Sequence, residues 1–367
     1  MNEQLSCRRR RRWRAAFLLT IGLCGLPGCG GSSSGDTSQD NPPVVMKGDR
    51  ILSMAVFAGS DDNYANAFAL GQALGMQSTS LALPWDELET APGIYDSDVL
   101  AFAETFFPAV NTTISLEINP IDTVKRRMPD DLASLPFNDP EVIGRYENLL
   151  DWVFSQIPDV QLTSLTIGNE VDDYLNSHPE EWPQYRDFYQ QVSAHARTLR
   201  PGLKVGVKAE FAGLVGNAQS NMQMLNQYSD VVEVTYYPLD ADFTVQPPTV
   251  VSGDFDTLAS LYPGRIIYVL EAGYPSSTEC GGSEVLQAAF IDQVFRAWDA
   301  HADQIKLISF FAIYDFSPEF VELAMEYYGL SSPCFAAYLG SLGLITYNGR
   351  QKPAYLLLGA DAAARGW

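Results

Sequence analysis

Histidine and several common catalytic motifs are scarce in this chain, and each absence excludes a kind of chemistry. Only three of the 367 residues are histidines and no His-Glu-x-x-His sequence occurs, which weighs against a zinc hydrolase. The first predicted strand leads into residues 58–62, Ala-Gly-Ser-Asp-Asp, which lack the GxGxxG spacing of a dinucleotide site. The one GxSxG match, residues 31–35, has no strand before it to form the nucleophile elbow of a serine hydrolase. We therefore expect no metal and no cofactor.

Basic side chains are also few once the first 28 residues are set aside. Residues 29–367 contain 17 Lys and Arg against 44 Asp and Glu, a formal charge of −27. Nucleic acids and anionic lipid surfaces are bound through clusters of positive charge. The composition predicts an acidic exported surface with no nucleic-acid partner.

The first 28 residues have the pattern of an export signal. Six arginines lie between residues 8 and 14, a short apolar run covers Ala15 to Leu26, and small residues follow. This run is shorter than the roughly 20 apolar residues of a spanning helix. The sequence Leu26-Pro27-Gly28-Cys29 resembles the lipobox of bacterial lipoproteins, although Pro27 departs from it. The resemblance implies that Cys29 is lipidated and anchors the protein in the bacterial cell envelope, with free secretion as the alternative.

A polar tract separates this signal from the folded body. Residues 29–46 are rich in Gly, Ser, Asp and Pro, so they cannot bury enough apolar surface to fold and should act as a tether. Residues 47–367 then form one domain. This body holds two cysteines, Cys280 and Cys334, which in an oxidising compartment form either a disulfide or two free thiols.

The body alternates β-type runs with segments of helical periodicity. Eight continuous apolar strands joined by helical crossovers predict a parallel sheet covered by helices. Eight such units in some 320 residues fit a closed α/β fold, the (β/α)8 TIM barrel, with an open doubly wound sheet as the alternative. The predicted strands are Ile51 to Ala58, Ser78 to Trp85, Thr112 to Ile118, Leu162 to Asn169, Lys204 to Phe211, Val231 to Tyr237, Ile266 to Glu271 and Leu307 to Tyr314.

Two glutamates close two of these strands. Glu170 follows the fourth strand and Glu271 ends the seventh. A barrel carries its chemistry at the carboxyl ends of its strands, and paired carboxylates are the working groups of most enzymes that cut glycosidic bonds. Glu117 and Glu210 lie near the ends of strands three and five, so they compete with this pair. We rank them lower, as substrate-binding or supporting carboxylates.

The sequences around the two glutamates resemble those of clan A glycoside hydrolases, which are (β/α)8 barrels. Gly168-Asn169-Glu170-Val171 and Glu271-Ala272-Gly273-Tyr274-Pro275-Ser276 are most similar to endo-β-1,3-glucanases. Thr235-Tyr236-Tyr237-Pro238 is closer to endo-β-1,4-galactanases. The resemblance spans residue 51 to about residue 358 and includes residues 85–96 and 343–355. It implies a retaining enzyme acting on a β-linked carbohydrate, with Glu170 as acid/base and Glu271 as nucleophile.

Other residues at the strand ends are candidates for substrate binding and support. Asn169 is expected to donate its amide to a sugar hydroxyl beside the reacting carbon. Tyr237 is expected to hydrogen-bond Glu271, and Tyr236 takes this role if the strand is shifted by one residue. Aromatic rings can stack on the flat faces of sugars, and the candidates are Trp85, Tyr274 and Tyr314. For each of them, ordinary packing in the core is equally expected.

Two departures from the clan keep a second function open. Many members carry an arginine on strand two, where this chain reads Ser80-Leu81-Ala82-Leu83-Pro84. The tryptophan often found at the end of strand eight is missing too, and Phe311, Tyr314 or Phe316 would have to replace it. The alternative is a carbohydrate-binding lipoprotein that keeps the barrel without turnover, because fold alone does not establish function.

Overall fold

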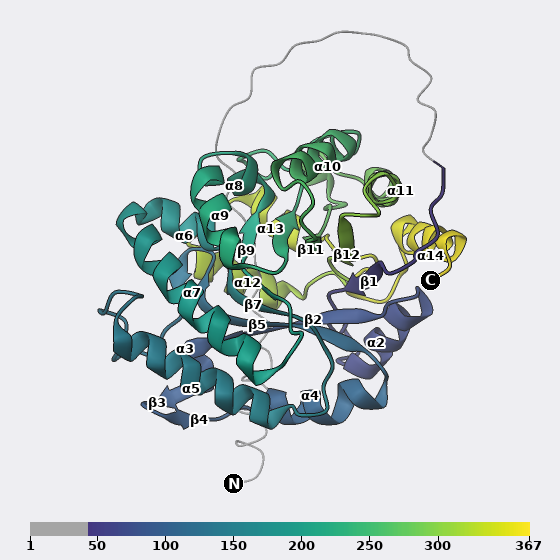
Figure 1. The fold of residues 1–367 in the computed structure, drawn as a ribbon. Coiled ribbons are helices and arrows are strands. Elements are labelled where there is room, and N and C mark those ends of the chain that lie inside the picture. Colours follow the sequence, from purple (N-terminus) through teal and green to yellow (C-terminus); the bar gives the residue numbers. More distant parts are fainter. Residues whose placement is uncertain (1–42) are drawn as a thin grey trace. The chain divides into compact units, whose positions relative to one another are not determined.

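The computed structural model describes residues 43–367 (Figure 1). These residues fall into two compact units. The first unit comprises residues 77–235 and 265–270, and the second comprises residues 43–76, 236–264 and 271–367. The predicted signal peptide, Cys29 and most of the predicted tether lie outside the described residues. Within residues 43–367, no helix is both long and apolar enough to cross a membrane.

The first unit is built on parallel strands. Strand β2 pairs with β5, β5 with β7, β7 with β8, and β9 with β10. A short strand, β6 (Lys125–Arg126), turns back antiparallel on β5, and β3 (Glu89–Ala91) pairs with β4 (Ile94–Tyr95). The parallel strands are β2 (Ser78–Pro84), β5 (Thr113–Asp122), β7 (Leu162–Asn169), β8 (Val205–Gly206), β9 (Lys208–Glu210) and β10 (Val232–Tyr236), of which the last residue belongs to the second unit.

The strand order closes on itself. The order is β8-β7-β5-β2-β1-β12-β11-β10-β9, and β8 and β9 are separated by the single residue Val207. They are therefore two halves of one strand, of which one half pairs with β7 and the other with β10. Counted in this way over residues 43–367, the closed sheet has eight parallel strands, and the predicted (β/α)8 barrel is confirmed.

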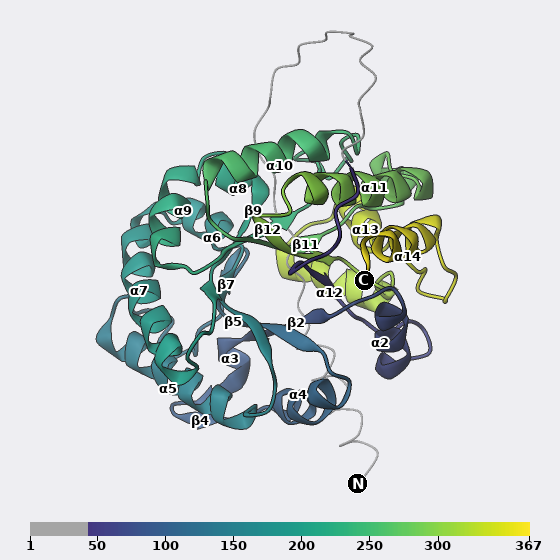
Figure 2. The ribbon, with the colours of Figure 1, turned by 45° about the vertical axis from the view of Figure 1, so that its right-hand side comes forward.

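Helices of the first unit pack along its strands with apolar faces. The apolar stripe of α5 (Pro140–Gln156) is buried at Val142, Tyr146, Leu149, Leu150, Val153 and Phe154. Asp139 caps this helix by accepting from the Glu141 amide. Helices α5 and α7 (Trp182–Leu199) run side by side (Figures 1 and 2). The remaining helices of this unit are α3 (Trp85–Leu88), α4 (Asp98–Ala109), α6 (Val171–Ser177), η1 (Pro179–Glu181), α8 (Phe211–Val215), α9 (Gln219–Leu225) and η2 (Asn226–Tyr228).

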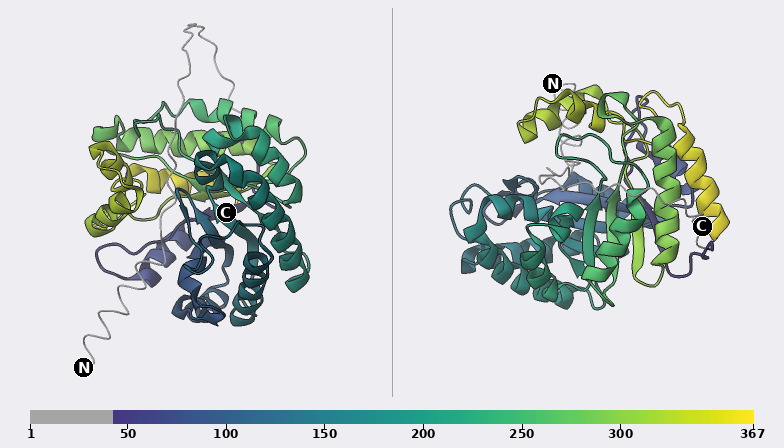
Figure 3. Two further views of the ribbon diagram at one scale, coloured as in Figure 1. Left: turned by 90° about the vertical axis from the view of Figure 1, so that its left-hand side faces the viewer. Right: turned by 90° about the horizontal axis from the view of Figure 1, so that it is seen from above.

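The second unit contains the parallel pair β1 (Ile51–Met54) and β12 (Ile305–Phe310). Strand β11 (Ile267–Ala272) ends in this unit with Glu271 and Ala272. Helix α14 (Pro353–Arg365) lies along α11 (Glu284–Ala300), and Figure 3 shows the yellow helix beside the green one. The other helices are α2 (Tyr64–Ala73), α10 (Val250–Leu261), η3 (Thr278–Cys280), α12 (Pro318–Tyr328) and α13 (Pro333–Leu339).

Candidate active site

Glu170 follows β7 directly and lies in a left-handed backbone conformation. Its φ and ψ are 42° and 48°, and the residue is fully buried, 0% exposed. A residue other than glycine is uncommon in this region. Both carboxyl oxygens accept hydrogen bonds, Oε2 from Thr123 Oγ1 at 3.0 Å and Oε1 from Thr235 Oγ1 at 2.7 Å. The chain thus turns sharply at the strand end and holds the carboxyl between two hydroxyl groups.

Asn169 is also fully buried, and its amide is used within the first unit. Its Nδ2 donates to Asp122 Oδ1 at 2.9 Å and to Thr123 Oγ1 at 3.2 Å. An amide nitrogen has two hydrogens, so both are engaged. The predicted contact between this amide and a sugar hydroxyl remains a prediction, and it would require one of these hydrogen bonds to break.

Glu271 is held in the second unit by a phenol. Tyr237 donates its hydroxyl to Glu271 Oε2 at 2.6 Å, and Glu271 is buried. The adjacent Tyr236 instead donates to Asp254 Oδ2 at 2.6 Å, and its ring meets Phe255 edge to face. The hydrogen bond expected of Tyr237 is therefore present, and Tyr236 contributes to packing instead.

Gly273 explains how the Tyr237 ring comes close to the strand that carries Glu271. A Cβ at this position would lie 2.5 Å from Tyr237 Cε1 and 3.0 Å from the Phe311 carbonyl oxygen. A Cβ contact as short as 2.5 Å essentially never occurs in real structures. The Glu271-Ala272-Gly273 sequence therefore needs glycine at its third position so that the phenol can reach the carboxylate.

The three aromatic rings proposed as sugar platforms are packing residues, which corrects the sequence interpretation. Trp85 is 0% exposed, donates Nε1 to Glu89 Oε2 at 2.8 Å and meets Tyr146 edge to face. Tyr274 is buried, with its hydroxyl on the Gln246 carbonyl oxygen at 2.8 Å. Tyr314 is buried as well. With so little exposed surface, these three side chains offer no open ring face to a sugar in this structure.

The competing carboxylates have other partners. Strand β5 continues to Asp122, beyond its predicted end, so Glu117 lies inside the strand, where Lys208 Nζ contacts its Oε2 at 2.7 Å. Both members of this ion pair are buried. Glu210 ends β9 as predicted, and its backbone N–H donates to Asp172 Oδ1 at 3.1 Å. Burial raises the pKa of the Asp172 carboxyl to about 7.

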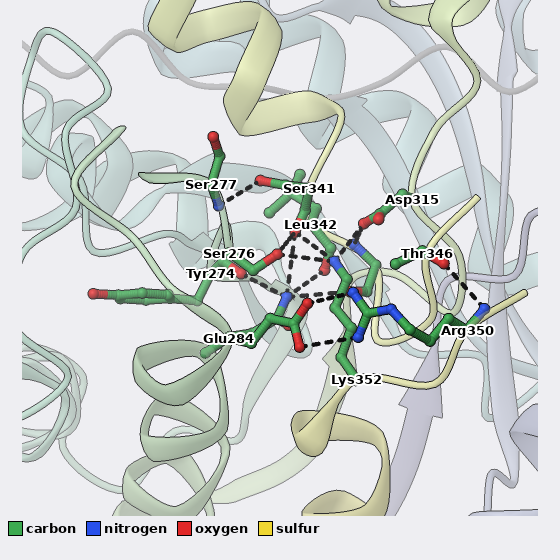
Figure 4. Close-up of polar contacts among 12 residues, drawn as sticks. Tyr274, Ser276, Ser277, Glu284, Asp315, Ser341, Leu342, Thr346, Arg350 and Lys352 are labelled. Carbon is green, nitrogen blue, oxygen red and sulfur yellow. Dashed lines mark hydrogen bonds and ion pairs between the residues drawn. The ribbon is translucent and has the colours of Figure 1, made fainter. Parts of the chain in front are cut away.

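A buried lysine joins the two loops that follow β11 and β12 (Figure 4). Lys352 Nζ donates to Asp315 Oδ1 at 2.7 Å, to Ser276 Oγ at 3.0 Å and to the Ser341 carbonyl oxygen at 3.0 Å. Burial lowers the pKa of this ammonium and raises the pKa of Asp315 to about 6. Ser276 closes the sequence motif that begins at Glu271. Lys352 therefore ties the segment after Glu271 to the motif at residues 343–355.

Three supporting residues were missed at the sequence level: Thr123, Thr235 and Lys352. Thr235 and Lys352 lie within motifs that resemble the clan, but nothing in those motifs assigns them a partner. Cys280 and Cys334 are free cysteines in the structure, with Cys280 Sγ 2.8 Å from the Cys334 carbonyl oxygen. The disulfide form stays a prediction. Among residues 43–367, no cluster of three or more His, Cys, Asp or Glu could hold a metal ion.

Several solved structures share this fold. GH5_18 from Streptomyces cattleya, in complex with GlcNAc, matches 86% of this chain and 80% of its own at 14% identity, with a TM-score of 0.66. The exo-beta-1,4-mannosidase Op5Man5 from Opitutaceae bacterium strain TAV5 matches with a TM-score of 0.65 at 14% identity, over 86% of this chain and 59% of its own. A family 39 glycoside hydrolase from Bacteroides cellulosilyticus WH2 has a TM-score of 0.62 at 14% identity, over 88% and 65%.

This chain thus spans less than two thirds of the mannosidase and of the family 39 enzyme. Neither a family model nor a curated protein sequence matches it. What the chain shares with these proteins is the (β/α)8 barrel on which glycoside hydrolases of families 5 and 39 are built.

Proposed function

We propose that this protein is a retaining glycoside hydrolase that cleaves a β-linked polysaccharide or oligosaccharide. The observation that carries the proposal is that Glu170 and Glu271, at the carboxyl ends of barrel strands four and seven, each accept hydrogen bonds from hydroxyl side chains. Active sites of such barrels lie at the carboxyl ends of the strands. The solved structures of similar fold include a mannosidase and a family 39 glycoside hydrolase, which supports the same class of reaction.

Glu271 is the proposed nucleophile. The Tyr237 phenol orients its carboxylate and stabilises the negative charge that attack requires. In the first step, a Glu271 oxygen attacks the anomeric carbon and forms a glycosyl ester while the bond to the leaving oxygen breaks. Glu170 donates its proton to that leaving oxygen.

In the second step, the ionised Glu170 takes a proton from water, and the resulting hydroxide equivalent attacks the same carbon. The ester bond to Glu271 breaks, so its carboxylate is regenerated and Glu170 is again protonated. Two inversions at one carbon give net retention of configuration. This mechanism requires the two carboxyl groups to be about 5 to 5.5 Å apart.

The substrate is proposed by class only. We propose a panel of test substrates. It includes β-1,4-mannosides because one protein of similar fold is an exo-beta-1,4-mannosidase and another was solved with Manb1-4GlcNAc. It includes β-1,3-glucan and β-1,4-galactan because of the motifs at Glu271 and Tyr237. The export signal and the lipobox at Cys29 support an envelope-anchored protein with residues 47–367 as its one domain.

A second candidate function is carbohydrate binding without turnover. It is favoured by the absence of arginine from β2 and by the missing tryptophan at the end of strand eight, both of which many clan members carry. Under this function, the two glutamates would contact hydroxyl groups of a bound saccharide instead of the reacting carbon.

Hydrolysis of a β-glucan, galactan and mannan panel tests the choice between them. The wild-type protein is compared with Glu170→Gln and Glu271→Gln, with saccharide binding measured in parallel. Loss of turnover in both variants with binding retained supports the hydrolase. Turnover unaffected by both substitutions overturns the site, and binding by all three proteins without turnover supports the second function.

A further inference from the structure

Thr123 and the proposed acid Glu170 both have left-handed backbones, and their side chains are hydrogen-bonded to each other. Thr123 has φ 48° and Glu170 has φ 42°, and the Thr123 backbone N–H donates to the Asn169 carbonyl oxygen at 3.0 Å. Thr123 is fully buried and follows β5 directly. A β-branched residue is a genuine outlier in this region, and such conformations persist only where the surrounding structure enforces them. The Thr123 hydroxyl contacts both Asn169 and Glu170.

The direction of the Thr123 hydroxyl follows from its neighbours. The Asp122 carboxylate can only accept hydrogen bonds, so the Asn169 amide must present Nδ2 to it. The same nitrogen directs its second hydrogen to Thr123 Oγ1 at 3.2 Å. A threonine hydroxyl has one hydrogen, and with Oγ1 accepting from Asn169 this hydrogen points to Glu170 Oε2 at 3.0 Å.

The positive charge of Arg127 near Asp122 favours the orientation of the Asn169 amide described above. Arg127 Nη1 lies 3.8 Å from Asp122 Oδ2, and the same guanidinium contacts Asp86 at 3.0 Å. A carboxylate beside a cation remains an acceptor, which fixes the amide of Asn169 in turn. The chain of contacts therefore runs from Asp122 through Asn169 and Thr123 to one oxygen of Glu170.

We infer that Thr123 is a positioning residue for the acid Glu170, because its hydroxyl reserves Oε2 as an acceptor and confines the transferable proton to Oε1. Oε1 is the oxygen 2.7 Å from Thr235 Oγ1, a hydroxyl to which no second donor of the first unit points. Thr235 can rotate to accept when Oε1 is protonated, whereas Thr123 is held as a donor. The inference rests on the proposed function and specifies that Glu170 transfers its proton from Oε1 and not from Oε2.

The test compares substrates that differ only in their leaving group. A poor leaving group needs the proton from Glu170. The dinitrophenolate of an activated glycoside of the same sugar departs without it. Thr123→Val keeps the shape but removes the hydroxyl, and should lower kcat/KM on the poor leaving group by about 10- to 100-fold, a part of what general acid catalysis supplies. The kcat/KM on the activated glycoside should fall less than about threefold, and Thr123→Ser should restore the wild-type pattern.

A second variant covers the case in which Thr123→Val does not fold. Asp122→Asn allows the Asn169 amide to turn over, so it should give the same selective loss with a smaller amplitude. Equal losses on both substrates, or a Thr123→Ser protein as impaired as Thr123→Val, would overturn the inference and leave the hydrolase intact. No turnover by the wild type on any substrate, or full turnover by Glu170→Gln, would overturn both.

Discussion

Glu170 and Glu271 are both carboxyls at strand ends, yet the chain surrounds them with different donors. Glu170 lies between two aliphatic hydroxyls, those of Thr123 and Thr235, on a left-handed backbone. Glu271 is an ordinary strand residue and accepts from one phenol, that of Tyr237. A phenol is a far stronger acid than an alcohol, so it stabilises a carboxylate charge more. The contrast shows how the same residue type acquires two roles from its surroundings.

Removal of each carboxylate gives the largest expected effect and tests this contrast first. Glu271→Ala should lose about 10⁴-fold or more in kcat on every substrate, because the nucleophile is needed for any leaving group. Glu170→Ala should lose as much in kcat/KM on natural saccharides but keep most of kcat/KM on a dinitrophenyl glycoside, whose first step needs no proton. Its kcat should fall on both substrates, because the second step lacks its base. Steady-state kinetics on both substrates measures this, and the reverse pattern would exchange the two assignments.

The phenol on Glu271 can be removed with a matched control in the next residue. Tyr237→Phe should lower kcat by about 10²-fold, the typical loss when one donor at a reacting charge is deleted. Tyr236→Phe deletes the hydroxyl of the neighbouring residue, which contacts Asp254 instead, and should lower kcat less than about threefold. Equal effects of both substitutions would mean that the Tyr237 contact is structural.

Lys352 extends the support of the Glu271 side into the following loop. Lys352→Met leaves the Asp315 carboxyl buried without its cation, which costs on the order of 3 kcal/mol of folding stability. Its effect on kcat should be a few-fold and equal for good and poor leaving groups, unlike that of Thr123→Val. Lys306→Met, which removes an exposed pair with Asp49, is the control and should change the unfolding free energy by less than about 1 kcal/mol. Thermal unfolding combined with kinetics separates the two.

The smallest expected effect on activity comes from a carboxyl inside the first unit. Glu233 is fully buried, and desolvation raises its pKa to about 8 although the Ser164 and Thr166 hydroxyls act against this. A raised carboxyl pKa gives stability that is complete below the unfolded pKa near 4.5 and is lost as the pH rises through about 8.

Glu233→Gln should therefore gain Tm relative to the wild type between pH 5 and pH 9, by several degrees, without altering the leaving-group dependence that belongs to Glu170. Thermal unfolding of both proteins at the two pH values measures the difference. Parallel Tm curves for the two proteins would contradict it. The other titrating carboxyls, including Asp172, are present in both proteins and cancel in the comparison.

Local sequence patterns predicted the strands and the two glutamates, because apolar runs and strand ends are properties of single segments. The pairing of Tyr237 with Glu271 also followed from the alternation of side chains along one strand. Thr123 escaped prediction because β5 continues four residues past its apolar run and then turns left-handed. Its partner Glu170 is 47 residues away, and such contacts leave no local pattern.

For the aromatic residues, the sequence suggested a role in sugar binding that their burial contradicts. Trp85 begins a stretch, residues 85–96, that resembles a clan sequence. The sequence alone does not tell whether an aromatic ring at a strand end faces a sugar or the core. The deciding fact is its contact with Glu89 and Tyr146, which depends on how residues 85–96 fold back. Burial of a large ring is a property of the assembled structure and not of its own segment.

The most direct test of the double displacement is to identify the residue that becomes glycosylated. A 2-deoxy-2-fluoro glycoside of a sugar that the enzyme hydrolyses slows release of the intermediate, and peptide mass spectrometry then locates the attached sugar. The proposed mechanism predicts a single adduct on Glu271, formed in wild type and absent from Glu271→Gln. An adduct on another residue, or product of inverted configuration with no adduct, would contradict it.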